Sequence, residues 1–148
     1  MKNYLAIDTA NEYLCIVANV EGKSVSRYLP DCAMKHSTAL MTEVDSLLKE
    51  NNITGLTAIW ASLSDKEPEK IIEMMKPYID TLYTVPLFGA RALTPDQLAD
   101  MARPHFENVY TANSVESAID KAMENMGSGL LVFGSLYLAS DSRKHLIT

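Results

Sequence analysis

The sequence has few of the residues that hold scaffolds together by covalent or metal bonds. Its 148 residues include two cysteines and three histidines. Cys15 and Cys32 lack the spacing of metal ligands and the histidines are far apart, so we expect no metal site and a reducing, cytoplasmic location. No apolar run approaches the roughly 18 residues of a membrane span, and no signal segment opens the chain. Neither membrane insertion nor export is therefore expected.

Positive charge is also scarce. The chain has 13 lysines and arginines against 19 acidic residues, which gives a net charge of −6. This balance offers no general attraction to a phosphate backbone, so nucleic acid is not an expected partner. Hydrophobic residues make up 47% and charged residues 22% of the chain, as in soluble globular proteins. A chain of this length buries a core without disulfides, so we expect one domain over residues 1–148.

The first third of the sequence predicts a meander followed by a helix. Short apolar runs at residues 4–7, 13–20 and 24–29 are typical of strands, and Glu21-Gly22-Lys23 favours an antiparallel hairpin between the second and the third. From about residue 36 to residue 51 the apolar period becomes helical. This helix carries five apolar residues: Leu40, Met41, Val44, Leu47 and Leu48.

The rest of the chain alternates between strand and helix patterns. Strands are predicted at four places: residues 57–63, 82–85, 108–111 and 130–133. Residues 64–67 and 94–97 both have the spacing of a capping box. Pro68 follows the first box and Pro95 lies within the second, and a proline is tolerated in the first turn of a helix. Ile79 is assigned to the apolar stripe of the first of these helices, Ser114 is expected to cap another, and a last helix is expected to begin at Ser135.

These patterns predict an α/β fold with three layers and a mixed, mostly parallel sheet of six or seven strands. An N-terminal β-meander is continued by Rossmann-like β/α units. A right-handed crossover through helix 36–51 would place strand 57–63 beside strand 3–8. We therefore expect a strand order that begins 3-2-1-4.

Residues 1–54 resemble the N-terminal part of TsaB (YeaZ), a partner protein in the threonylcarbamoyl-adenosine modification of tRNA. The resemblance rests on Leu5-Ala6-Ile7-Asp8-Thr9-Ala10, the hairpin around residues 21–23, and Lys35-His36-Ser37. It implies a meander of the RNase H/actin-like kind, with Asp8 and Thr9 as a vestigial phosphate or metal position. The family's Gly-Pro-Gly-Ser-Phe-Thr-Gly loop is missing, and an Asp that satisfies turn amides explains Asp8 equally well.

Residues 57–148 resemble the C-terminal domain of folylpolyglutamate synthase, a relative of the Mur ligases. Three stretches carry the resemblance: Leu63-Ser64-Asp65-Lys66, Arg91-Ala92-Leu93 and Gly134-Ser135-Leu136-Tyr137-Leu138. It implies that Asp65, Arg91 and Ser135 are vestigial ligand contacts. Capping also explains Asp65 and Ser135, and the family's Asp-Gly-Ala-His-Asn-Pro motif is absent.

The two resemblances meet near residues 53–57, which indicates a composite chain. We interpret it as an engineered chimera, with a natural recombinant as the alternative. No G-x-x-x-x-G-K-[ST] phosphate loop is present in the 148 residues. The sequence therefore predicts a scaffold without catalytic residues, metal or cofactor, and not an enzyme.

Two other functions stay open from the sequence. One is a protein-interaction module of the TsaB type acting through helix 36–51, with interface residues Leu40, Met41, Val44 and Leu48. The apolar stripe there predicts weak homodimerisation with Met41 exposed, unless all five apolar residues face the sheet. The other is a remnant of ligase activity.

Overall fold

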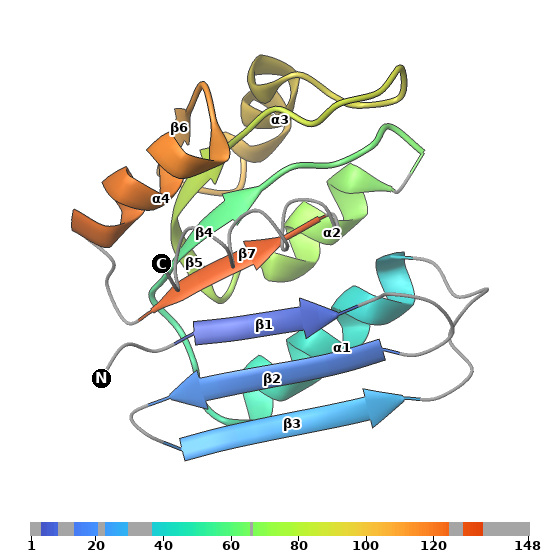
Figure 1. The fold of residues 1–148 in the computed structure, drawn as a ribbon, viewed down its shortest axis with the longest axis vertical. Helices are drawn as coiled ribbons and strands as arrows, with labels where there is room; N and C mark the ends of the chain where they lie inside the picture. Colours follow the sequence, from blue (N-terminus) through green and yellow to red (C-terminus); the bar gives the residue numbers. More distant parts are fainter. Residues whose placement is uncertain are drawn as a thin grey trace.

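A single sheet organises the chain (Figure 1). The computed structural model describes residues 4–8, 14–20, 23–29, 37–65, 67–124 and 129–134, with side chains from residue 41 onward. Within these residues the sheet has seven strands: β1 (Tyr4–Asp8), β2 (Leu14–Val20), β3 (Lys23–Leu29), β4 (Leu56–Trp60), β5 (Ile79–Thr84), β6 (Asn108–Thr111) and β7 (Leu130–Phe133). The helices are α1 (Ser37–Glu50), α2 (Pro68–Met75), α3 (Pro95–Ala102) and α4 (Val115–Glu124).

The sheet is mixed, as the sequence predicts. β1, β2 and β3 form an antiparallel meander. β1, β7, β4, β5 and β6 run parallel to one another. The α/β fold with its Rossmann-like parallel part is therefore confirmed.

The predicted strand order is wrong at one position. The order is β3-β2-β1-β7-β4-β5-β6, so β7 lies between β1 and β4. Leu130 of β7 is paired with Tyr4 on one side and with Thr57 on the other. A crossover rule fixes the hand of a connection but not the number of strand positions that it spans. The connection through α1 leaves a gap of one strand, which the last described strand fills.

Helices cover both faces of the sheet. In Figure 1, α4 crosses in front of the parallel strands, whereas α1 and α2 lie behind the sheet. Buried residues of α1, α2 and α3 share one core cluster with Ala58 and Trp60 of β4 and Leu131 and Phe133 of β7. Buried residues of α4 form the second cluster with Ile59, Leu130 and Val132, which alternate with the first set. The predicted three layers follow from this alternation.

The apolar residues of α1 face the core. Met41 is 2% exposed, Val44 and Leu47 are fully buried, and Leu48 is 1% exposed. The expectation that Met41 is exposed is therefore wrong, because the helix packs against α2 as well as the sheet and both cover its wide stripe. The side chain of Leu40 lies outside the described part of the chain.

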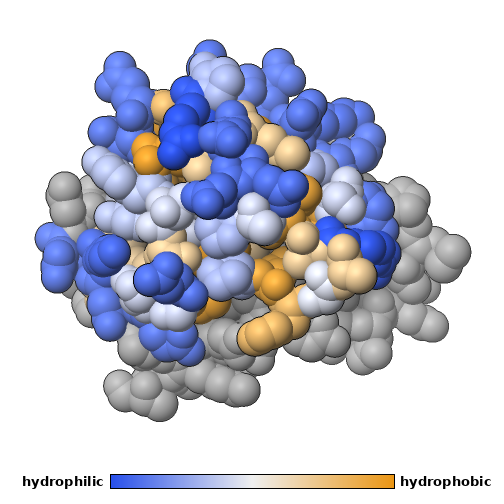
Figure 2. Space-filling model, turned by 90° about the horizontal axis from the view of Figure 1, so that it is seen from above, coloured by the Kyte–Doolittle hydropathy of each residue, from blue (hydrophilic) through white to orange (hydrophobic). Residues whose placement is uncertain are grey.

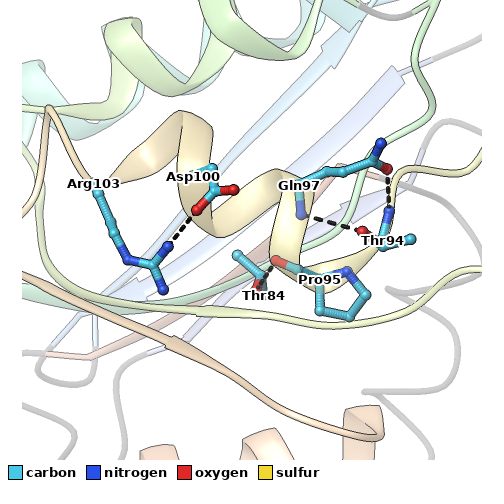
Figure 3. Close-up of polar contacts among 6 residues, drawn as sticks. All are labelled: Thr84, Thr94, Pro95, Gln97, Asp100 and Arg103. Atoms are coloured by element: carbon cyan, nitrogen blue, oxygen red, sulfur yellow. Dashed lines mark hydrogen bonds and ion pairs between the residues drawn. The ribbon is translucent and has the colours of Figure 1, made fainter.

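The two predicted capping boxes have different outcomes. The Thr94 side chain accepts a hydrogen bond from the Gln97 amide at 3.1 Å, and the Gln97 side chain accepts one from the Thr94 amide at 2.9 Å (Figure 3). This box is confirmed. The box at Ser64 is wrong, because α2 begins at Pro68 and its N-cap is Glu67, with no side-chain capping bond. Ser64 instead belongs to a turn described below.

Three further boundaries complete the comparison with the sequence. β4 ends at Trp60, three residues before its predicted end, and Ile79 is the first residue of β5 instead of a helical residue. The Ser114 hydroxyl oxygen accepts a hydrogen bond from the Ser117 amide at 3.1 Å, so Ser114 caps α4, as expected. The helix predicted from Ser135 lies outside the described residues.

Candidate functional site

Two loops meet at the carboxyl edge of the parallel strands. One follows β4 and the other, residues 85–94, follows β5. An antiparallel bridge pairs Leu63 of the first loop with Ala92 of the second. Ligands of open α/β sheets bind outside the carboxyl ends of the strands. This edge is therefore the candidate site.

Backbone hydrogen bonds fix the two loops to each other. The Ser64 amide donates to the Arg91 carbonyl at 2.7 Å, and the Leu93 amide donates to the Ser62 carbonyl at 3.1 Å. These bonds explain why Ser64 is not a helix cap, since its backbone is held to the neighbouring loop. The side chains at residues 64–65 and 91 are thereby placed together.

Asp65 and Arg91, two of the residues predicted as ligand contacts, form an ion pair. A guanidinium nitrogen of Arg91 donates to a carboxylate oxygen of Asp65. The side chains are 64% exposed for Arg91 and 44% exposed for Asp65. An exposed pair of this kind contributes only about 0–1 kcal/mol. The contact gives Arg91 a local partner of opposite charge.

Gly134 brings the end of β7 against the end of β4. Its φ is +113°, a conformation that favours glycine. A Cβ atom at this position would lie 1.8 Å from the carbonyl oxygen of Ala61. The backbones after the two strands therefore approach too closely for any side chain at residue 134. Ser135, the third predicted ligand contact, lies outside the described residues.

Asp8 is the last residue of β1 and lies at the same edge. Leu5 is paired with Leu131, so Asp8 and Gly134 each lie three residues beyond a paired position. Its backbone thus reaches the carboxyl edge beside β7. Thr9 lies outside the described residues. Among the predicted site residues whose side chains are described, the structure brings Asp65 and Arg91 into contact.

Phe88 is the exposed residue at this edge that the sequence analysis missed. Its ring is fully exposed, at 102%, within the loop that also carries Arg91. Residues 86–90 contain no charged side chain. Figure 2 shows, on the face that it draws, polar side chains around smaller groups of apolar atoms. Gly89 between a strand and a capping box is a signal for a loop, but it does not indicate that the Phe88 side chain is exposed.

A partly buried polar contact lies away from the carboxyl edge, just before β5. The Tyr78 hydroxyl donates to a carboxylate oxygen of Asp45 on α1 and lies 3.3 Å from the Asp45 carbonyl oxygen. Burial of Tyr78, together with the hydrogen bond and the negative charge of Asp45, raises its pKa to about 12. This contact joins α1 to the start of β5.

The described residues add no metal centre and no membrane helix. Among them, no group of three or more histidine, cysteine, aspartate or glutamate side chains is placed to hold a metal ion. The helices in the described part of the chain are too short or too polar to cross a membrane.

No protein-family model matches the chain. A dihydrofolate synthase/folylpolyglutamate synthase of Haemophilus influenzae is 27% identical over 110 residues, which are 72% of this chain and 25% of that protein. The folylpolyglutamate synthase of Mycobacterium tuberculosis complexed with ADP and AMPPCP has a TM-score of 0.67 at 23% identity, over 76% of this chain and 28% of that one. The folylpolyglutamate synthase of Thermotoga maritima has a TM-score of 0.61 at 23% identity, over 89% of this chain and 30% of that one.

These relatives identify the fold. The chain spans about a quarter of the length of the curated relative. The resemblance of residues 1–54 to TsaB and the composite origin stay predictions. What the comparisons support is a segment similar to the C-terminal region of folylpolyglutamate synthases, with the α/β fold of that region.

Proposed function

We propose that this chain is a folded α/β scaffold, similar in part to the C-terminal region of folylpolyglutamate synthases, without catalytic activity of its own. The observation that carries the proposal is the absence of a G-x-x-x-x-G-K-[ST] phosphate loop from the 148 residues. The structure adds that Asp65 and Arg91, two candidate ligand contacts, are bonded to each other in an exposed and therefore weak ion pair.

The sequence supports the same proposal. A ligase that uses ATP needs a loop to hold the phosphates, and the 148 residues contain no G-x-x-x-x-G-K-[ST] stretch. The curated relative is about four times as long as the part that this chain matches. The position of Asp8 at the sheet edge does not replace that loop, because phosphate binding requires several donors around the anion.

The composite origin is part of the proposal. Its support is the pair of resemblances that meet near residues 53–57, together with the missing TsaB-type glycine-rich loop. The folylpolyglutamate synthases match 72–89% of this chain, which is more than residues 57–148 provide, so their similarity extends into residues 1–54 and weighs against an abrupt junction and an engineered chimera. One natural gene encoding both segments would contradict an engineered origin and leave a natural recombinant.

An interaction module acting through helix 36–51 is not favoured. Met41, Val44 and Leu48 belong to the core and offer no apolar interface. Weak homodimerisation stays a prediction, and sedimentation over a wide range of protein concentrations tests it. A dimer would have to use a surface other than these three side chains.

An ADP-release assay tests the proposed lack of catalysis. The folded chain is incubated with ATP, Mg²⁺, a reduced folate and glutamate, and ADP is measured by a coupled reaction. We expect no ADP above a blank without protein. A folylpolyglutamate synthase assayed in parallel establishes that the reagents support turnover.

The contradicting result is ADP release that depends on the chain's own residues. Turnover by the parent that disappears in Asp8→Ala or in Arg91→Ala would overturn the proposal. Tyr110→Ala, at the exposed edge strand, is the matched control and should keep any turnover that belongs to the site. Turnover that persists equally in all variants would indicate a contaminating ATPase, and turnover lost in Tyr110→Ala as well would indicate a non-specific loss of folded protein.

A further inference from the structure

We draw no further inference here: the strongest candidate, the uncharged loop of residues 86–90 that holds the fully exposed Phe88 ring at the carboxyl edge of the sheet, carries nothing because no feature of the described residues shows what covers it.

Discussion

At the scale of single residues, Tyr78 shows how one tyrosine links a helix to the start of a strand. Its ring is 6% exposed, and its hydroxyl donates to Asp45. The hydrogen bond is partly buried, and a carboxylate acceptor makes a stronger hydrogen bond than a neutral one. The contact links α1 to the chain that enters β5.

Tyr78→Phe is predicted to lower the free energy of unfolding by about 1–2 kcal/mol at pH 8, because it removes this bond and keeps the ring. The pKa of Tyr78 is raised from 10.0 to about 12, so the folded protein keeps the proton that the unfolded chain loses. The parent therefore loses stability as the pH rises from 10 to 12. The difference in the free energy of unfolding between the parent and Tyr78→Phe should therefore be smaller at pH 11 than at pH 8, by about 1 kcal/mol.

Urea unfolding at pH 8 and pH 11 measures both effects. Tyr110→Phe is the control, since Tyr110 is 51% exposed and the variant keeps its ring against Tyr83. A gap between parent and Tyr78→Phe that stays constant over this pH range would show that the hydroxyl is not held as described.

Gly134 and Gly89 form a matched pair of glycines with positive φ, +113° and +121°. An alanine Cβ would lie 1.8 Å from the Ala61 oxygen at residue 134 but would meet nothing within 4 Å at residue 89. Gly89→Ala should cost about 1–2 kcal/mol for the backbone conformation alone. Gly134→Ala should cost about 3 kcal/mol or more, because the collision is added. Equal losses in urea unfolding would contradict the close approach of β4 and β7.

At the scale of elements, the chain contains two capping-box patterns of which one caps a helix. Thr94→Ala should lower the free energy of unfolding by about 1 kcal/mol, because it removes a bond to the Gln97 amide. Ser64→Ala should change it by less than about 0.5 kcal/mol, since Ser64 is exposed and is not the N-cap of α2. Thermal unfolding of both variants tests the assignment. A larger loss from Ser64→Ala than from Thr94→Ala would reverse it.

Sequence pattern predicted the elements well where local chemistry decides them. β6 and β7 have the predicted bounds, and the Thr94 box lies at its predicted place. Sequence pattern gave the wrong helix start where a loop distant in the chain binds the backbone. The Arg91 carbonyl holds the Ser64 amide, so the helix starts three residues later than the first box suggests.

The same limit applies to the candidate site. Asp65 and Arg91 were identified from sequence, but their contact depends on the bridge between Leu63 and Ala92, which joins loops 29 positions apart in the chain. The exposure of Phe88 depends on what surrounds the loop, and no local pattern encodes that. Gly134 enters the sequence analysis only as part of a stretch that resembles folylpolyglutamate synthase, whereas its structural role is to fit against Ala61, which no local pattern predicts.

At the scale of the whole molecule, the insertion of β7 between β1 and β4 joins the antiparallel meander to the other parallel strands in one sheet. Strand order is the property that sequence predicted least well, because it depends on a strand some 70 residues after β4. The core is shared in the same way. Leu47 of α1 and Trp60 of β4 belong to one cluster, and Trp60 stacks on Phe133 with the ring centroids 6.1 Å apart.

The most direct test of this shared core is the unfolding of Leu47→Ala followed by two probes. Trp60 is the only tryptophan of the chain, so its fluorescence reports on the segment after residue 57, while far-UV circular dichroism reports on all elements. Removing a fully buried leucine should lower the free energy of unfolding by about 2–5 kcal/mol. We predict that both probes shift together to the same lower urea midpoint. A Trp60 transition that stays at the parent's midpoint, while part of the dichroism is lost earlier, would contradict one shared core.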